Sequence, residues 1–225
     1  MELSENTLNV LKNFSGVNQN MMIRTGNTIK TISEARTVLA TAKVSEEFPI
    51  DFGIYDLNEF IGVLSLVDTP RLDFKDEFVV VNDSTGRSKV KYFFSSEDTL
   101  TSPQKDITMP ESNVKFTLDN DTMNKLKRAA STLGHGEVSI SGQDGVLSLS
   151  VVDSQNMTSN AFSIDVDGEF DKDAVFNFIL SINNLKILPG DYEVAISSKL
   201  ISQFSHKSLD VKYWIALEKT STFGV

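Results

Sequence analysis

The sequence contains no cysteine and only two histidines, His135 and His206. The absence of cysteine excludes disulfide bonds, thiolate nucleophiles and zinc–thiolate sites, and it fits a reducing compartment. Neither histidine has a second candidate ligand at a spacing that metal-binding motifs use, so we interpret both as surface or turn residues. The sequence therefore gives no signal for thiol chemistry or for a metal site.

Long apolar runs are missing as well. No stretch reaches the length of about 18 apolar residues that a membrane helix needs, and the N-terminal segment MELSENTLNVLKNFSG has neither a basic leader nor a long apolar core. We therefore expect no membrane span and no signal peptide, and we expect a cytoplasmic protein. With 225 residues, 40% of them hydrophobic, the chain can form one large domain or two domains of about 110 residues.

Catalytic motifs are also missing, because the sequence has neither a Gly-x-Ser-x-Gly elbow nor a Gly-x4-Gly-Lys phosphate loop. One acidic stretch, DVDGEFDKD at 165–173, resembles a calcium-binding loop. With Gly168 at the glycine position of such a loop, however, the first ligand becomes Ser163 and the twelfth Ala174, and two anchoring ligands are lost. We interpret these acids instead as the approach to a helix, where negative charge is stabilising. We expect no catalytic residue, no metal ion and no cofactor.

Positive charge is scarce. There are 21 lysines and arginines against 31 aspartates and glutamates, which gives a formal net charge of −10. A protein that holds nucleic acid by overall attraction needs a basic surface that displaces counterions. The net charge taken alone therefore points away from DNA, and the solubility that an acidic surface confers explains it equally well.

What the sequence does contain is an internal repeat. Val90-Lys91-Tyr92 recurs as Val211-Lys212-Tyr213 at an offset of 121 positions. Two further segments recur in the same order: NTLNVLKNF (6–14) as DTMNKLKRA (121–129), and LNEFIGVLSLV (57–67) as VFNFILSINNL (175–185). Three ordered matches indicate a duplicated domain with small loop insertions.

We therefore predict an α+β fold of two similar domains, 1–96 and 114–225, joined by a polar linker at 97–113 that contains two prolines. Each domain is expected to have a helix, several strands, a second helix and further strands. The second helices are the repeated segments 57–67 and 175–185. The expected strands, paired across turns such as the one at Gly86, are 21–32, 37–44, 78–82, 89–94, 137–141, 146–152, 192–197 and 210–218.

The first helix of each domain has one apolar and one polar face. In the helix at 121–133 the polar face and its flank contain Asn124, Lys125, Lys127, Arg128 and Ser131, opposite Met123, Leu126, Ala130 and Leu133. In the helix at 5–14 the polar face contains Glu5, Asn9, Lys12 and Asn13, opposite Leu8, Leu11 and Phe14. A polar helix face taken alone is most simply interpreted as an ordinary surface in contact with solvent.

Four segments resemble one known family. They are LKNFSGVNQNMMIRTG (11–26), YDLNEFIGVLSLV (55–67), FNFILSINNLKILPGDYEV (176–194) and YWIALEKTST (213–222). Together they are similar to the sliding clamp, the DNA polymerase processivity factor, of tailed bacteriophages related to the T-even group. The resemblance runs from the first expected helix to the last expected strand.

The resemblance implies a DNA clamp fold. In this fold, three two-domain subunits form a homotrimeric ring, two helices per domain line a central hole, and antiparallel sheets lie outside. It implies a protein that is not an enzyme, encircles duplex DNA without reading its sequence, and acts in DNA replication in the cytoplasm of an infected bacterial host. Such a ring reconciles acidity with DNA binding, because a few cations can face the phosphates. The residues expected to face DNA are Asn9, Lys12, Asn13, Lys125, Lys127 and Arg128.

The resemblance also implies partners: a C-terminal peptide of the replicative DNA polymerase, an ATP-driven clamp loader and late transcription factors. A peptide site needs apolar residues beside a flexible segment. Candidates are Ile107 and Met109 in the linker and Phe223 and Val225 at the C-terminal end, although apolar linker residues commonly only pin a linker to a domain. Phe93 and Phe94 are candidates for the contact between subunits, because unpaired sheet edges are usually covered.

Two other classes stay open from the residues alone. A β-rich phage structural or assembly protein that forms a trimer would share the acidity and the duplication. A hydrolytic or carbohydrate-active β-protein would need paired carboxylates in a cleft.

Overall fold

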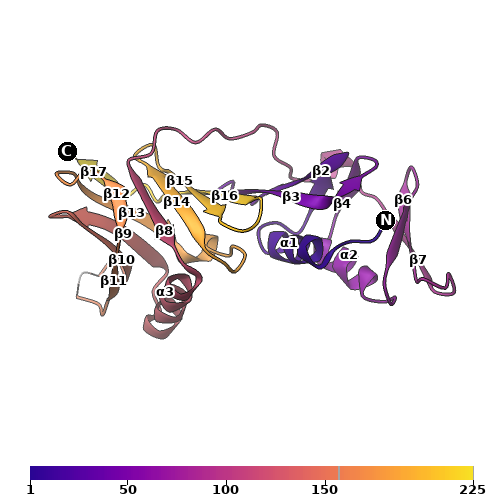
Figure 1. Ribbon diagram of the computed structural model, residues 1–225, viewed down its shortest axis with the longest axis horizontal. Helices are drawn as coiled ribbons and strands as arrows, with labels where there is room; N and C mark the ends of the chain where they lie inside the picture. Colours follow the sequence, from indigo (N-terminus) through magenta and orange to yellow (C-terminus); the bar gives the residue numbers. More distant parts are fainter. Residues whose placement is uncertain (157, 225) are drawn as a thin grey trace. The chain divides into compact units, whose positions relative to one another are not determined.

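The computed structural model describes residues 1–156 and 158–224, and the chain divides into two compact units, Met1–Asp106 and Ile107 onward. The elements of the first unit, in chain order (Figure 1), are α1 (Glu5–Ser15), β1 (Met21–Ile23), β2 (Gly26–Ile32), β3 (Val38–Phe48), β4 (Phe52–Ile54), α2 (Leu57–Leu64), β5 (Arg71–Phe74), β6 (Phe78–Asn82), β7 (Lys89–Phe93) and the 3₁₀ turn η1 (Glu97–Thr99).

Helix α1 begins at a cap that joins it to strand β3. The hydroxyl of Ser4 accepts a hydrogen bond from the backbone N–H of Thr7, and Glu46 on β3 accepts from the N–H of Ser4 and the hydroxyl of Thr7. Burial alone would raise the pKa of Glu46, but these hydrogen bonds outweigh it and hold the pKa below its ordinary value. The charged carboxylate also suits the N-terminal end of the helix dipole.

Helices α1 and α2 contact each other through apolar residues at spacings of three and four. The buried apolar side chains of the two helices are Val10, Leu11, Phe14, Leu57, Phe60 and Leu64. Asp56 caps α2 by accepting from the N–H groups of Asn58 and Glu59. Tyr92 of β7 packs edge-on against Phe60, with ring centroids 5.2 Å apart, so one face of the β7 sheet lies against α2.

The strands of the first unit form antiparallel groups. Within this unit β2 pairs with β3, β1 pairs with β4, and β5, β6 and β7 form a three-stranded sheet in that order. The predicted hairpin at 78–94 is confirmed as β6–β7, with Gly86 at a φ of 70° in its turn. The predicted pairing of strand 21–32 with strand 37–44 is confirmed for β2 and β3, but residues 21–23 form the separate strand β1, which pairs with β4. Four phenylalanine rings close the core beside these strands, with successive centroids between 5.0 and 6.5 Å apart: Phe48, Phe52, Phe74 and Phe94.

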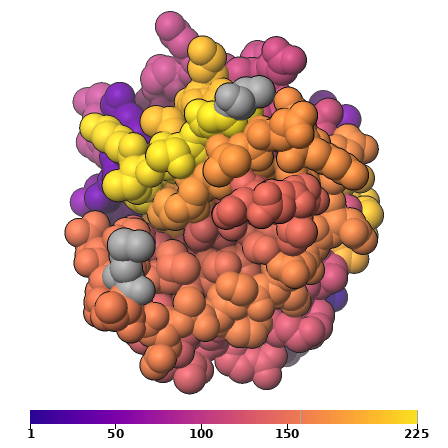
Figure 2. Space-filling model, turned by 90° about the vertical axis from the view of Figure 1, so that its left-hand side faces the viewer, coloured from indigo at the N-terminus to yellow at the C-terminus, as the bar shows by residue number. Residues whose placement is uncertain are grey.

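The described elements of the second unit, in chain order, are β8 (Val114–Leu118), α3 (Asn120–Leu133), β9 (Glu137–Gln143), β10 (Val146–Val152), β11 (Phe162–Val166), β12 (Gly168–Phe170), β13 (Val175–Ser181), η2 (Ile182–Asn184), β14 (Tyr192–Ser197), β15 (Ile201–His206), β16 (Val211–Ala216) and β17 (Thr222–Gly224). One sheet has the order β11-β10-β9-β13-β17, and in the other β12, β8, β14, β15 and β16 are successive neighbours. In Figure 2 the C-terminal residues, in yellow, lie beside the orange segments of the first of these sheets.

Helix α3 has a defined start and end. The carboxylate of Asp119 accepts a hydrogen bond from the N–H of Thr122 at 2.6 Å. This hydrogen bond is the largest of the causes that lower the pKa of Asp119. The helix ends at Gly134, whose left-handed φ of 70° is accessible to glycine at no steric cost. The helix lies against β10, so the sequence-based prediction of a helix at 121–133 is confirmed.

The prediction of a second helix in the second domain is wrong. Residues 175–185 form strand β13 followed by the single 3₁₀ turn η2. Phe176 and Phe178 are buried while Val175 and Asn177 are exposed, which is the alternation of a strand. Aromatic and β-branched residues favour that conformation, and β9 and β17 pair with β13 on its two sides.

The repeat is therefore partial at the level of structure. The pairs α1 with α3 and β7 with β16 are elements of the same type, whereas α2 corresponds in the alignment to a strand. The described residues of the second unit contain one α-helix, not the two that were expected. The acidic stretch at 165–173 consequently runs from the end of β11 through β12 to the turn before β13, and the interpretation that it approaches a helix is wrong.

The first part of the predicted linker is bound to the first unit. After η1, the N–H of Thr101 donates to Asn20 Oδ1 at 2.8 Å, and the side-chain amide of Asn18 donates to the carbonyl of Thr101 at 3.4 Å and to that of Ile32 at 2.8 Å. Lys30 forms an ion pair with Asp106. These contacts hold the stretch between η1 and Asp106 to the first unit.

Candidate nucleic-acid interface

Helix α3 has its polar residues on the side opposite its buried residues, as its sequence predicts. The buried residues are Thr122, Met123, Leu126 and Ala130. The exposed residues include Asn124, Lys125, Arg128 and Ser131. The exposed side of the helix therefore presents hydrogen-bond donors and positive charge to solvent.

The three cations of α3 differ in their surroundings. Lys125 Nζ lies 2.6 Å from the carboxylate of Asp121, one turn earlier, and exposed pairs of this kind contribute only about 0.3–0.5 kcal/mol. Lys127 is half-buried, and burial lowers its pKa. Arg128 is exposed. Lys125 and Arg128 are therefore better placed to meet a phosphate than Lys127, which lies at the border of the apolar face.

Lys125 and Arg128 share a groove of about 530 Å³ between α3 and the start of β11. The other residues that line it are Ala129, Thr132, Leu133, Ala161 and Phe162. The groove thus combines two cations with a largely apolar lining on one surface of the second unit.

Helix α1 places the other predicted residues together on the first unit. Asn9 and Lys12 are exposed and Asn13 is half-buried. Lys12 is in the last turn, where a cation suits the C-terminal end of the helix dipole. That these residues and those of α3 face DNA stays a prediction.

The two candidates for the contact between subunits lie at the end of β7. Phe93 is 60% exposed, whereas Phe94 is half-buried against Phe52, with ring centroids 5.0 Å apart. Lys91 Nζ lies 3.7 Å from the ring centroid of Phe78 and 4.5 Å from that of Phe93. An exposed aromatic ring on a sheet edge fits a contact surface, but the role of both residues stays a prediction.

The candidates for peptide docking differ in how far the fold uses them. Ile107 and Met109 are half-buried in the irregular stretch before β8. Phe223 on β17 stacks on Phe176 and Phe178, with ring centroids 6.2 and 6.0 Å apart. Val225 lies outside the described residues. The docking role of these residues stays a prediction.

Both histidines are hydrogen-bonded near turns. His206 Nδ1 accepts from the N–H groups of Ser208 and Leu209, each at 3.1 Å, so its Nε2 donates to the carbonyl of Pro189 at 3.2 Å in the neutral ring. His135 Nε2 lies 2.7 Å from the carbonyl of Asn160. In the described part of the chain, no group of three or more His, Cys, Asp or Glu side chains is arranged to hold a metal ion. None of the helices described is long and apolar enough to cross a membrane.

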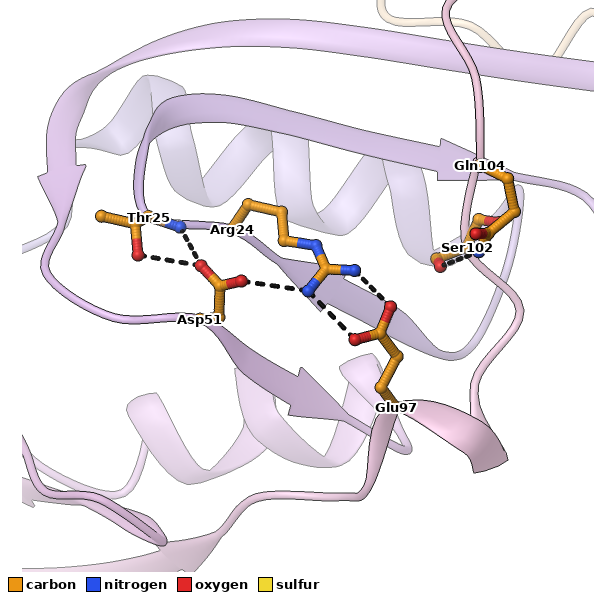
Figure 3. A network of polar contacts seen from close by, with 6 residues as sticks. All are labelled: Arg24, Thr25, Asp51, Glu97, Ser102 and Gln104. Carbon is orange, nitrogen blue, oxygen red and sulfur yellow. Dashed lines mark hydrogen bonds and ion pairs between the residues drawn. The ribbon is translucent and has the colours of Figure 1, made fainter.

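A polar network at the start of the linker was missed by sequence reasoning (Figure 3). Arg24 contacts both carboxylate oxygens of Glu97 in η1 and reaches Asp51 at 3.0 Å. Asp51 also accepts from the N–H and the hydroxyl of Thr25 at 2.7 and 2.8 Å. Hydrogen bonds from Thr25 and then from Arg24 lower the pKa of Asp51, while Glu97 and then Asp51 raise that of Arg24. No motif links these residues, so no signal in the sequence could have found the network.

The two units of helices and antiparallel strands define the protein as one with a DNA clamp fold. A solved structure of the Proliferating Cellular Nuclear Antigen from Entamoeba histolytica matches with a TM-score of 0.69 over 94% of each chain, at 15% identity. At that identity the likeness shows the fold alone.

Comparison by sequence identifies the family, which the structural match alone does not. The family model described as gp45 sliding clamp, C terminal, matches residues 115–219, and the model described as DNA polymerase processivity factor matches residues 4–99. The sliding clamp of Vibrio phage KVP40 is 34% identical over 97% of this chain and 99% of its own length. The sliding clamps of Escherichia phage RB69 and Enterobacteria phage T4 are 30% and 28% identical, each over 99% of both chains. The chain belongs to the sliding clamps of T4-related bacteriophages, which are DNA polymerase processivity factors.

Proposed function

We propose that three copies of this chain close into a ring around duplex DNA and tether the replicative polymerase for processive synthesis in the infected host cytoplasm. Each subunit contributes two clamp domains, 1–96 and 114–225, joined by the linker 97–113. Membership of the sliding clamp family supports the tethering role. Two clamp domains in each of three subunits give a ring of six similar parts, whose edges are closed by contacts between unlike domains.

The main support is the distribution of charge on α1 and α3. The chain carries a net charge of −10, yet the only acidic residues of these helices are Glu5 and Asp121, both in the first turn. Beyond the first turn, all charged residues of the two helices are cations: Lys12, Lys125, Lys127 and Arg128. Beyond the first turn, these helices therefore present cations and no acidic side chain of their own to passing phosphates. Asparagines such as Asn9 and Asn13 add weak, exchangeable contacts that suit sliding.

The partners follow from the same function. A C-terminal peptide of the polymerase docks at an apolar site that includes Ile107, Met109, Phe223 and Val225, an ATP-driven loader opens the ring, and late transcription factors use the loaded ring. Half-buried Ile107 and Met109 in an irregular segment support the docking site. As a tether, the ring needs no catalytic residue of its own.

The test compares retention on circular and linear DNA. The protein is loaded on nicked circular DNA with loader and ATP, isolated by gel filtration, and measured again after one restriction cut at the same salt concentration. We expect retention on the circle and loss from the linear product, because enclosure and not affinity retains a ring. Blocking both ends of the linear DNA with a bound protein should restore retention. Equal retention on the circle and on the unblocked linear DNA would contradict the proposal.

A further inference from the structure

In the second unit, an irregular segment follows β13 at the place where the sequence repeat predicts a second helix. After β13 the chain continues through η2 to Gly190 without forming an α-helix. Building on the proposed ring, we propose that this segment, residues 182–190, forms part of the surface that faces DNA and that Lys186 contacts backbone phosphates of the duplex. Lys186 is thus a DNA contact that lies outside α1 and α3.

Hydrogen bonds at both ends place segment 182–190 alongside α3. At the start of the segment, the N–H of Ile182 donates to the carbonyl of Gly136, just beyond the C-terminal end of the helix, at 2.8 Å. At its end, the N–H of Gly190 donates to Oδ1 of Asn120, the first residue of the helix, at 3.1 Å. The segment therefore runs antiparallel to α3 from one end to the other. Its middle residue, Lys186, lies beside the middle turns of the helix.

Helical spacing shows on which side of α3 the segment runs. Residues seven positions apart lie on nearly the same side of an α-helix, so Lys127 lies on the side of Asn120, where the segment ends. Lys127 is half-buried. Lys125 and Arg128 are exposed on the other side, at the groove beside β11. Lys127 therefore stands between the exposed cations of the helix and the segment that contains Lys186.

The segment packs its apolar side chains inward. Its buried residues are Leu185, Ile187 and Leu188. Its exposed residues recur at every third position, and they are Asn183, Lys186 and Pro189. The carbonyl of Leu188 accepts from the hydroxyl of Tyr192 at 2.7 Å, and its N–H donates to the hydroxyl of Tyr213 at 3.2 Å. Lys186 therefore extends away from the sheet, as the exposed residues of α3 do, from a backbone that the sheet holds in place.

The charge on this surface suits phosphates. Lys186 is the only charged residue of the segment. Asp191, which follows the segment, accepts from the N–H of Asn120 at 2.9 Å, so its carboxylate lies at the N-terminal end of α3 with Asp119 and Asp121. These three acids lie at one end of the helix, away from Lys186. Lysine contacts to phosphates position a protein on DNA without reading its sequence, as sliding requires.

Cross-linking from single cysteines tests the proposal, and the absence of native cysteine leaves no background. The variants K186C, R128C and K212C are labelled with an aryl azide, loaded on nicked circular DNA with loader and ATP, and irradiated. K212C is the control. Lys212 is exposed and alternates along β16 with Tyr213, whose hydroxyl contacts Leu188, so Lys212 lies on the opposite face of the sheet. We expect DNA adducts from K186C and R128C and none from K212C.

The other outcomes separate this proposal from the proposed ring. Adducts from R128C without adducts from K186C would overturn the role of Lys186 and leave the ring in place. Adducts from K212C as abundant as those from K186C would also overturn it, because contact would then not be confined to one face. A parent protein that is not retained on the circle would overturn both proposals.

Charge substitution is the second test. K186E should load several-fold less than the parent at about 50 mM salt, and the deficit should shrink toward about 200 mM salt, because counterion release supplies the attraction. K186R keeps the charge and should load as the parent does. K212E makes the same change of charge on the opposite face and should also load normally. Equal loading of K186E and K212E would overturn the phosphate contact, while normal loading of the parent would still support the ring.

Discussion

The guanidinium of Arg24 contacts both oxygens of the Glu97 carboxylate, 73 positions later in the chain. Arg24 lies between β1 and β2, and Glu97 begins η1 at the start of the linker, so this pair holds the linker to the sheet region of the first unit (Figure 3). A bidentate contact fixes the orientation of the carboxylate as well as its distance from the guanidinium. A lysine at the same position could not fix that orientation.

Replacing Glu97 by Gln should loosen the start of the linker with little loss of global stability. Both side chains are about half exposed, and exposed pairs contribute about 0.2–1 kcal/mol. Amide hydrogen exchange should rise in residues 97–104, while the free energy of unfolding should fall by no more than about 1 kcal/mol. Glu111→Gln, an exposed site in the same linker, is the matched control. Unchanged exchange in E97Q would show that other contacts hold the linker.

Asp83 should make the β6–β7 turn sensitive to acid. Its carboxylate accepts from the N–H groups of Thr85, Arg87 and Ser88 at 2.9 to 3.1 Å. Burial alone would raise its pKa, but these hydrogen bonds lower it from 3.8 to about 2. Because the pKa is lower in the folded state, the stabilisation is complete above the ordinary value and is lost as the pH falls through about 2.

The variant Asp83→Asn should therefore have a lower Tm than the parent at pH 7, and the difference should shrink as the pH falls from about 4 toward about 2. An amide can still accept from Thr85 but cannot reproduce the second accepting oxygen. Thermal unfolding followed by circular dichroism across this pH range measures the effect, with Asp76→Asn in the preceding turn as control. A Tm difference independent of pH would contradict it.

At Gly142 the backbone of β9 lies so close to the ring of Phe176 that a side chain would not fit between them. A Cβ at this position of β9 would lie 2.2 Å from a ring carbon of Phe176, whose ring also contacts Phe178 and Phe223. Gly142→Ala should displace that stack and lower the free energy of unfolding by about 1–3 kcal/mol. Gly136→Ala, where a Cβ meets nothing within 4 Å, should have a much smaller effect. Equal denaturation midpoints for the two variants would contradict this account.

The parts of the fold that the sequence predicted are those set by local pattern. Apolar residues at spacings of three and four define α1 and α3, whose capping residues Ser4 and Asp119 stand just before them. The prediction of a helix at 175–185 was wrong for a physical reason. A short apolar run fits a buried strand as well as a helix, and pairing with β9 and β17 selects the strand.

The candidate site was likewise predictable only where it depends on local sequence pattern. The polar faces of α1 and α3 follow from the period of the helix, so the exposure of Lys12, Lys125 and Arg128 could be expected. Half-burial of Lys127 could not, because it depends on how closely the neighbouring elements approach the helix. The Arg24–Glu97 pair could not be foreseen either, since only the fold brings residues so far apart in sequence together.

Changing Ile107 and Met109 to Ser should separate docking from assembly. Both side chains are half-buried in an irregular segment, so their loss should weaken polymerase-dependent processive synthesis while sedimentation still shows a trimer. Thr108→Ala, between the two positions and exposed, is the control. Loss of the trimer would make these residues structural, and unchanged processivity would place the docking site elsewhere.

Reversing the cations of α3 tests the DNA-facing surface itself. Lys125→Glu with Arg128→Glu replaces two positive charges by two negative ones in every subunit, on an exposed helix face. The free energy of unfolding should change by only about 0.5 kcal/mol, including the lost pair with Asp121. Loading and sliding should fail, because phosphates inside a confined channel would be repelled with incomplete screening.

The matched control is Lys199→Glu with Lys207→Glu, which makes the same change of charge at exposed lysines on either side of β15. Both variants should be trimers with similar Tm values. Loader-dependent retention on nicked circles, measured at one fixed salt concentration, should be lost only in the α3 variant. If the two variants load equally well, net charge and not the position of these cations governs loading, and α3 does not face the DNA.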